Sequence, residues 1–415
     1  MKLKRHTVSF AVLAVMSTFL NCADMEQEEW EPDTSKLIIG LSLPLTGPIG
    51  QFGRSMDASA RLAASEINAA GGVNGQQIEM VVRDTKLNAD VALEGIKELD
   101  ALGVQCIIGA AASSMTTAVA NGYTTEKGIP LISPSSTAPE ITDLGNVWRT
   151  AQSDDYQGVE LANFVAEESV TKAALIYVDS VYGQGLFNAF KETFEALGHS
   201  VVASVPYEEG KESGFSSEVT TLLEASPEGI IIIGFATDGA NITRDLKAAS
   251  PDDSIKYFGG EGLYSPEFLA NADQSIAAVM KGTAPKADTE SENTTTFNTN
   301  YKNIVGQDPT IYGSNAYDAT YLCALAMAKG GANTAEAARN NLAAVSKDET
   351  DDKTELVVNV GQASEALTAI ANGTAINYEG ASGNVDFDDN GDVVTGVTRW
   401  QVTGSAGSLS YETVQ

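Results

Sequence analysis

The feature that most constrains the fold is a long alternation of short apolar runs with longer segments of helical spacing. From Leu37 onward the apolar runs have the length and residue types of strands, and helical segments separate most of them. This alternation predicts parallel β-sheets that are covered by helices on both faces. The predicted strands are Leu37–Leu43, Ile78–Val82, Val104–Ile108, Pro130–Ile132, Ala173–Val178, Ser200–Val205, Gly229–Gly234 and Ile255–Gly259.

One sheet built from all these strands would be unusually large, so the sequence favours an α/β fold with two doubly wound parallel-sheet lobes. A length of 415 residues suits two or three domains. Helices are predicted after about Lys281, at Ser291–Ile304, Tyr312–Lys329 and Thr334–Val345, and a β-rich segment at Gly383–Val402. No Pro- or Ser-rich connector is present, so the chain is expected to cross between the lobes more than once.

The amino terminus predicts export. Basic residues precede the apolar run Val8–Leu20, which is too short for a confident membrane span and is typical of a signal peptide, residues 1–21. Cys22 follows in a context that resembles the lipidation site of bacterial lipoproteins. Residues 22–35 then form an acidic tether, and the membrane is reached through the lipid anchor only. In the alternative, an ordinary signal peptide is cut near Ala23 and Cys22 is lost.

The overall charge and the motif search exclude several functions. The formal net charge is −31, which repels a polyanion, so nucleic acid is not expected as a partner. Outside the leader the only histidine is His199, and no nucleophile elbow, phosphate-binding loop or metal-ligand motif is present. The chain is therefore not expected to be an enzyme or to hold a cofactor or metal.

Three further features have structural interpretations. Cys106 and Cys323 lie in apolar runs and are expected to be free and buried. The segment Asp386–Asp392 resembles the start of a calcium loop, but Val397 stands where the closing glutamate should be. A turn between strands at Asn390–Gly391 is the favoured interpretation.

Clustered hydroxyl residues follow two predicted strands, in Gly109–Thr117 and Ser133–Glu140. Open α/β sheets bind ligands at this end of their strands. Ser113 or Ser114 with nearby amide groups could hold a small carboxylate, because a hydroxyl can both donate and accept. From spacing alone the favoured alternative is that these residues cap helices, as Thr137–Glu140 is a good capping box.

Several segments, in this order, resemble one family. They are Pro44–Gly53, Ala69–Gly75, the Ser113–Ser114 loop, Gly128–Glu140, Arg149–Asp154 and Tyr182–Gly185. Together they resemble the type I periplasmic solute-binding proteins, and within these the leucine/isoleucine/valine-binding proteins of amino-acid ABC transporters. The resemblance extends from about Lys36 to the end of the chain.

The resemblance implies two lobes joined by three crossovers near Asp155, Thr283 and Ala381, with a ligand held between them. Lobe 1 would comprise residues 36–155 and 284–381, and lobe 2 residues 156–283 and 382–415. A chain of this kind is expected to be a monomer that closes by hinge motion around its ligand.

The resemblance also implies how an amino acid would be held. Ser113, with Ser114 beside it, and Thr137 would hold the ligand carboxylate, while the Ser135 carbonyl and the Thr137 hydroxyl would face the ammonium. Glu261 from lobe 2 would complete that ammonium site, and Asp154 is a further candidate. Without the resemblance, Glu261 would be interpreted as an exposed acid in a glycine-flanked turn.

The family positions that line the side-chain pocket correspond to Phe52, Tyr182, Tyr312 and Ala236. Ala236 stands where the branched-chain binders have tyrosine, which would enlarge the pocket, so the ligand is expected to be an amino acid larger or more polar than leucine, or a related amide. In the alternative, Phe235 takes over this role through a one-residue shift.

The resemblance implies a periplasmic or cell-surface receptor that captures an amino-acid-like ligand and delivers it to an ABC importer through the permease. The alternative is a ligand-sensing or regulatory lipoprotein of the same fold without a role in transport.

Overall fold

Two separate β-sheets organise the chain. The computed structural model describes residues 33, 35–249, 254–286, 291–347 and 355–414. The predicted signal peptide, Cys22 and nearly all of the predicted tether lie outside these residues. Among the described residues, no helix combines the length and the apolar character needed to cross a membrane.

The first sheet is entirely parallel and has the strand order β2-β1-β3-β4-β5. Each of the seven positions of its interior strand β1 is buried, as expected for a strand with helices on both faces. The strands are β1 (Leu37–Leu43), β2 (Ile78–Asp84), β3 (Ile107–Gly109), β4 (Leu131–Ser133) and β5 (Val147–Arg149).

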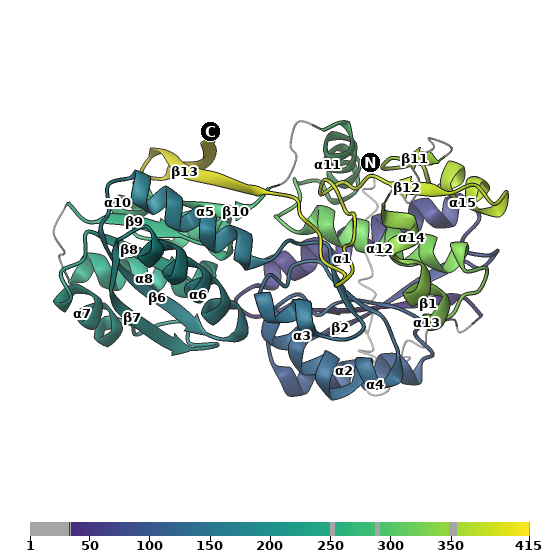
Figure 1. The fold of residues 1–415 in the computed structure, drawn as a ribbon, viewed down its shortest axis with the longest axis horizontal. Helices are drawn as coiled ribbons and strands as arrows, with labels where there is room; N and C mark the ends of the chain where they lie inside the picture. Colours follow the sequence, from purple (N-terminus) through teal and green to yellow (C-terminus); the bar gives the residue numbers. More distant parts are fainter. Residues whose placement is uncertain (1–32, 34, 250–253, 287–290, 348–354, 415) are drawn as a thin grey trace, which may run out of the picture. The chain divides into compact units, whose positions relative to one another are not determined.

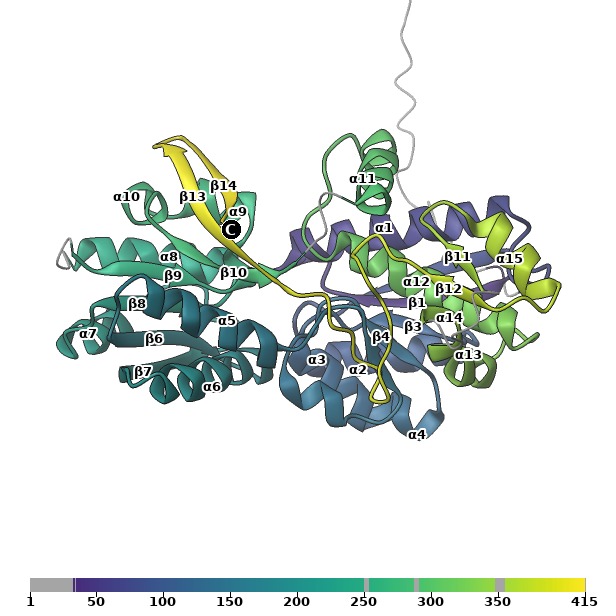
Figure 2. The ribbon, with the colours of Figure 1, turned by 45° about the horizontal axis from the view of Figure 1, so that its top comes forward.

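Helices from distant parts of the sequence cover the first sheet. Figure 2 shows α1 above this sheet and α2 and α3 below it. Helix α12 packs along α1 and is apolar on all sides, so it is buried over most of its length. The helices are α1 (Gly50–Ala69), α2 (Ala89–Ala101), α3 (Ser113–Val119), α4 (Thr125–Lys127), α11 (Glu292–Val305), α12 (Gly313–Lys329), α13 (Ala335–Asn341), α14 (Ala343–Ser346) and α15 (Ala363–Ala371); β11 (Leu356–Val358) pairs with β12 (Ile376–Tyr378).

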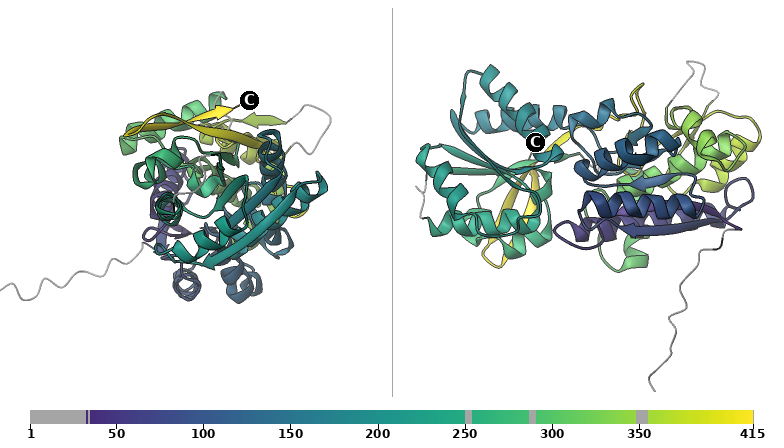
Figure 3. Two further views of the ribbon diagram at one scale, coloured as in Figure 1. Left: turned by 90° about the vertical axis from the view of Figure 1, so that its left-hand side faces the viewer. Right: turned by 90° about the horizontal axis from the view of Figure 1, so that it is seen from below.

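The second sheet has the order β14-β13-β10-β9-β8-β6-β7. Its five strands β6 to β10 run parallel and repeat the order of the first sheet, whereas β13 and β14 add an antiparallel edge (Figures 1 and 3). The strands are β6 (Lys172–Asp179), β7 (Ser200–Glu208), β8 (Gly229–Ile233), β9 (Lys256–Gly259), β10 (Lys281–Pro285), β13 (Val397–Ser405) and β14 (Ser408–Val414); the helices are α5 (Asp154–Glu167), α6 (Val181–Ala196), α7 (Ser216–Glu224), α8 (Ala236–Ala248), α9 (Pro266–Asn271) and α10 (Gln274–Ala277).

Two apolar cores define the lobes. The first core includes residues up to Ala151 and the second begins at Leu161; Ala284 still belongs to the second, and the first resumes at Phe297. The chain therefore crosses between the lobes near Asp155 and again after Ala284. Cys106 and Cys323 are free and fully buried in the first core, as predicted.

The third crossing was predicted near Ala381, and this position is wrong. Val385, Phe387 and Val393 still pack in the first core, so the chain crosses only between Val393 and β13. The physical reason is an ion pair: the Arg149 side chain is fully buried, and its Nε lies 2.6 Å from Oδ1 of Asp392.

The segment Asp386–Asp392 forms a turn, as favoured over a calcium loop. The backbone N–H groups of Asn390 and Asp392 donate to Oδ1 of Asp388, at 2.8 and 3.0 Å. The prediction of flanking strands is wrong, because residues 383–396 contain no strand and β13 begins only at Val397.

Candidate functional site

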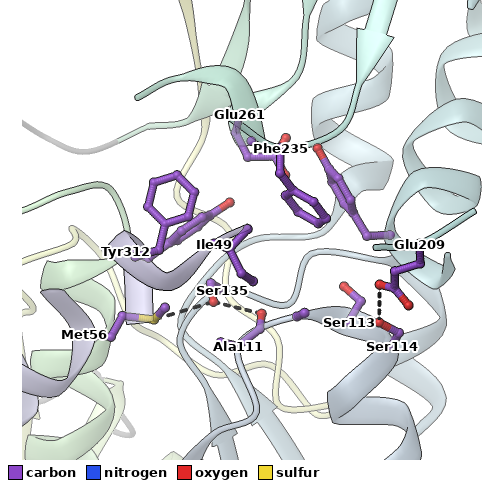
Figure 4. Close-up of a pocket in the computed structure, with 14 residues that line it drawn as sticks. Ile49, Met56, Ala111, Ser113, Ser114, Ser135, Glu209, Phe235, Glu261 and Tyr312 are labelled. Carbon is purple, nitrogen blue, oxygen red and sulfur yellow. Dashed lines mark hydrogen bonds between the residues drawn. The ribbon is translucent and has the colours of Figure 1, made fainter. Parts of the chain in front are cut away.

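A pocket lies where the loops at the carboxyl ends of the two sheets meet. In each lobe the strand order reverses beside β1 or β6, and ligands of α/β sheets bind at such switch points. Residues that follow β1, β3, β6 and β8 all contribute to the pocket, whose free volume is about 40 Å³ (Figure 4). Its lining comprises Ile49, Phe52, Met56, Ala111, Ala112, Ser113, Ser114, Ser135, Tyr182, Glu209, Phe235, Glu261, Gly262 and Tyr312.

Most of the predicted binding residues meet in this pocket. The first lobe contributes Phe52, Ser113, Ser114, Ser135 and Tyr312, and the second contributes Tyr182 and Glu261. These residues are far apart in the sequence, so the two-lobed fold is what brings them together.

Thr137 and Asp154 lie behind the wall of the pocket rather than on it. Both are almost completely buried, and the Thr137 hydroxyl donates to Oδ2 of Asp154 at 2.9 Å. The backbone N–H of Asp154 also donates to the Thr137 carbonyl, at 2.7 Å. In this conformation the two residues therefore bind each other.

Ala236 does not line the pocket, which corrects the prediction. It is the first residue of α8, and it packs fully buried in the second core. Phe235, the alternative considered from the sequence, lines the pocket instead and stacks on Tyr182 with ring centroids 5.6 Å apart. Ala236 therefore does not enlarge the pocket, contrary to the expectation from the sequence.

Glu261 is held in a single 3₁₀ turn, residues 261–263, directly after β9. The loop needs glycine at position 262, because a Cβ there would lie 2.1 Å from the Gly234 carbonyl oxygen. Gln157 donates to Oε2 of Glu261 at 2.6 Å. Burial raises the pKa of Glu261 to about 7, although this hydrogen bond opposes the shift.

The surroundings of Glu261 are acidic and incompletely hydrogen-bonded. Burial, and then the charge of Glu261, raises the pKa of Asp154 well above its ordinary value. Among the described residues, Oδ1 of Asp154 and the hydroxyls of Tyr182 and Tyr312 are buried without a hydrogen-bond partner. A cationic donor bound here would stabilise both carboxylates, because burying two such groups without a cation is unfavourable.

The side of the pocket formed by the first lobe carries serine hydroxyl groups and two residues with strained backbone. The Ser135 hydroxyl donates to the Ala111 carbonyl at 2.9 Å, and the Ser113 hydroxyl accepts from the Ala138 N–H at 3.3 Å. Ala111 and Tyr312 have left-handed φ values of 73° and 68°. Such backbone costs about 1 kcal/mol or more per residue and is concentrated at functional sites.

Two hydrogen bonds join the lobes around the pocket. Gln51 of α1 donates to the Ser265 hydroxyl at 2.8 Å, and the Ser114 hydroxyl donates to Oε1 of Glu209 at the same distance. The two lobes are thus directly connected by side-chain hydrogen bonds.

Sequence reasoning missed Glu209 and Gln157. A signal for Glu209 was present, because this acid, followed by Gly210, comes shortly after the predicted strand Ser200–Val205, on the side where α/β sheets bind ligands. Gln157 lies on α5, and nothing in its sequence context distinguishes it. Within the described part of the chain, no group of His, Cys, Asp or Glu has the arrangement of a metal site.

A two-lobed fold with a small pocket between the switch points of its two sheets is the architecture of a solute-binding receptor. The comparison with known families agrees. The chain matches the periplasmic binding protein family over residues 36–397 and belongs to it. Membership of this family places the protein outside the cytoplasm.

Individual relatives and solved structures show which receptors of this family the chain is similar to. The chain is 31% identical to a leucine-, isoleucine-, valine-, threonine- and alanine-binding protein of Pseudomonas aeruginosa, over 74% of this chain and 83% of the relative. It is 28% identical to BasB of Halobacterium salinarum, a substrate-binding protein of a chemotactic signal transduction system, over 88% of this chain and 86% of the relative. The fold resembles that of LivJ from Streptococcus pneumoniae, solved with isoleucine, with a TM-score of 0.73 at 24% identity over 91% of this chain and 99% of that chain.

Proposed function

We propose that this receptor captures a free amino acid or a related amide between its lobes and delivers it to the permease of an ABC importer, without catalysing any reaction. The observation that carries the proposal is the acidic side of the pocket. Glu261, with Asp154 behind it, offers negative charge and unpartnered oxygen atoms to an ammonium group. From the other lobe, Ser113, with Ser114 beside it, offers a hydroxyl group to the ligand carboxylate, and the carbonyl of Ser135 faces the ammonium.

Thr137 and Asp154 join the ligand contacts in this proposal through a rearrangement. When an ammonium is bound, the unpartnered Oδ1 of Asp154 accepts from it, and a rotation of the Thr137 side chain exchanges its hydrogen bond to Oδ2 for one to the ligand. The named ligands of the Pseudomonas relative are also amino acids, which supports the assignment.

A thermal-shift screen tests this proposal. The protein is unfolded and refolded to remove carried-over solute, and is then screened against the twenty common amino acids and their amides. A solute at 100 times its Kd should raise the free energy of unfolding by about 2.7 kcal/mol. One or a few amino acids should stabilise the protein, and Glu261→Ala should lose the effect; the absence of any stabilising amino acid would contradict the proposal.

Sensing is the second candidate function, and the similarity to BasB favours it because that relative matches most of this chain. Uptake of labelled ligand and chemotaxis toward it separate the two functions in cells that lack the gene. Loss of uptake supports transport, whereas loss of chemotaxis with normal uptake supports sensing.

We also propose that the protein is a monomer anchored to the membrane by a lipid on Cys22. Membrane fractionation of the full chain tests the anchor. The wild-type protein should sediment with membranes and Cys22→Ser should be released; equal release of both would contradict the lipid anchor.

A further inference from the structure

Glu261 has a fixed hydrogen-bond donor on helix α5, and the proposed function does not use that donor. Nε2 of Gln157 donates to Oε2 of Glu261 at 2.6 Å and to the carbonyl oxygen of Thr283 at 3.3 Å. The Gln157 side chain is 1% exposed, so bulk water does not compete for these contacts. Both N–H groups of the amide are therefore committed to acceptors whose positions are set by the fold.

The direction of the Gln157 amide favours the charged form of Glu261. A carboxylate and a backbone carbonyl only accept hydrogen bonds, so an amide turned the other way would place its oxygen atom against two acceptors. Burial raises the pKa of Glu261, and the hydrogen bond from Gln157 opposes this effect. Gln157 therefore stabilises the form of Glu261 that can bind an ammonium group.

Close helix packing fixes the position of Gln157. The next residue, Gly158, has no room for a side chain, because a Cβ there would lie 2.4 Å from Cβ of Ala189 on α6. Helix α5 therefore lies directly against α6 and cannot turn about its own axis without a clash. Asp154 precedes Gln157 by three residues, so both side chains lie on the same face of α5.

The contacts of Gln157 also reach the segments that connect the lobes. Helix α5 follows the first crossover, and Thr283 lies just before the second. The Thr283 carbonyl oxygen also accepts from Nε1 of Trp400 at 3.0 Å, and Trp400 lies on β13, which follows the third crossover. Gln157 thus links Glu261 to elements next to all three crossovers.

We propose that Gln157 is a positioning residue that anchors the Glu261 carboxylate to these elements and keeps it ready to accept the ligand's ammonium group. This inference rests on the proposed capture of an amino acid through Glu261. Gln157 acts through Glu261, because it does not itself line the pocket.

The titration of Glu261 in the refolded protein, without added solute, tests the anchor directly. Gln157→Met keeps the length of the side chain and removes the donor. NMR of isotope-labelled glutamate, with Glu261→Gln to assign the signal, should show the Glu261 midpoint raised by about one pH unit. Gln157→Glu keeps the shape of the side chain and should raise the midpoint further, because another acid then faces Glu261. An unchanged midpoint in both variants would overturn the proposal.

The other titratable groups near Glu261 remain in place in both variants. The groups whose charges interact with Glu261 are Asp154 on α5, Tyr182 on α6 and Tyr312 before α12. Arg149 acts on Asp154 from β5. A shift that appears only when position 157 changes is therefore due to the lost donor.

Calorimetric titration tests the effect on binding. The solutes are leucine, isoleucine, valine, threonine and alanine, which the name of the Pseudomonas relative includes. Gln157→Met should weaken the binding of each solute that the wild type binds. The loss should be several times larger at about pH 6 than at about pH 8.5, because a higher pH restores the carboxylate. An equal loss at both pH values would reduce Gln157 to a structural role and overturn the proposal.

Gln152→Met is the matched control. Gln152 is also 1% exposed, but its Oε1 accepts from the Gly396 N–H at 2.7 Å, and its hydrogen bond does not involve Glu261. This variant should leave the Glu261 midpoint and the pH dependence of binding unchanged. The unfolding temperatures of all variants show whether each one is folded. A midpoint shift of equal size in Gln152→Met would assign the effect to general loosening and would overturn the proposal.

Failure of the proposed function has a different signature. If no amino acid binds to the wild-type protein while Gln157→Met still raises the Glu261 midpoint, amino-acid capture is contradicted and the anchoring of Glu261 stands. If amino acids bind and the midpoint does not move, the anchor is contradicted and capture stands.

Discussion

At the scale of single residues, burial governs the chemistry of the pocket. A carboxyl group that loses water without gaining a cation favours its protonated form, and both Glu261 and Asp154 show this effect. The unpartnered hydroxyls of Tyr182 and Tyr312 surround the same charges. The pocket therefore disfavours the charged forms of Glu261 and Asp154, and a bound ammonium group would stabilise them.

Ligand binding should release a proton, and Glu261 is the source. Burial raises the pKa of Glu261 to about 7, so part of the Glu261 population carries a proton near neutral pH. A bound ammonium favours the charged carboxylate and lowers this pKa, so a proton leaves on binding and affinity rises as the pH increases toward the raised pKa of about 7. Titrations in buffers of different ionisation enthalpy measure the released proton.

Glu261→Gln provides the control for proton release. A glutamine has no proton to lose, so the release at pH 7 should disappear and the affinity should fall at least tenfold. Equal proton release in wild type and variant would assign the proton to Asp154 or another group.

Gly262 should be essential for the position of Glu261. A methyl group at residue 262 would lie 2.1 Å from the Gly234 carbonyl oxygen and 3.3 Å from Cδ1 of Phe235, so the turn must shift. Gly262→Ala should weaken ligand binding at least tenfold and lower the free energy of unfolding by about 1–3 kcal/mol. Calorimetry and urea unfolding measure the two effects.

An exposed glycine away from the pocket serves as the comparison. A Cβ at Gly145 would meet only Cγ2 of Thr125, at 3.3 Å, so a shift of a few tenths of an ångström makes room for it. Gly145→Ala should leave the ligand affinity unchanged. If Gly262→Ala binds ligand as tightly as wild type, the turn is not what positions Glu261.

At the scale of elements, the sequence predicted what depends on local pattern and missed what depends on distant partners. The strand Leu37–Leu43 agrees at both ends because its burial on both faces leaves an uninterrupted apolar run. The segment that contains Asp392 looked β-rich, but its position is set by Arg149, which is 243 residues away. The spacing of apolar residues along the sequence cannot indicate an ion pair between residues so far apart.

The candidate site divides in the same way. The Ser113–Ser114 loop and Glu261 could be assigned from motifs whose residues are neighbours in the sequence. Whether Phe235 or Ala236 lines the pocket depends on the residue at which α8 begins. A shift of one residue in that position exchanges one side chain for the other. Helix ends are uncertain by that amount when only the sequence is known.

The Arg149–Asp392 pair should contribute strongly to stability. Besides Asp392, the guanidinium donates to the carbonyl oxygens of Thr137 and Ala138, at 3.1 and 2.9 Å. Asp392→Ala leaves this charge buried and unpaired, which should lower the free energy of unfolding by about 3–5 kcal/mol. Guanidinium chloride unfolding measures the loss.

Asp389 is a suitable control because it lies in the same turn and is exposed. Asp389→Ala removes the same charge and should change the free energy of unfolding by less than about 0.5 kcal/mol. Equal stability of Asp392→Ala and wild type would mean that apolar packing of Val385, Phe387 and Val393 alone holds this segment.

At the scale of the whole molecule, charge repulsion opposes folding. The formal net charge of −31 exceeds what solubility requires of a chain of this size, and acids outnumber bases 56 to 25. The ion pairs of the described residues use only a minority of these acids. Folding concentrates the uncompensated charges, so the folded state gains most from screening.

Added salt should therefore stabilise this protein. The Debye length falls from about 10 Å at 0.1 M to about 3 Å at 1 M, which removes most repulsion between exposed acids. The unfolding temperature should rise by several degrees between 0.05 and 1 M sodium or potassium chloride, as scanning calorimetry can measure.

The buried contacts of Glu261 are screened much less, so the ligand Kd should change by less than about threefold over the same range. Sucrose at matched osmolality separates screening from general solute exclusion, because it leaves the charges unscreened. An unfolding temperature that stays constant or falls with salt would mean that the surface acids do not oppose folding.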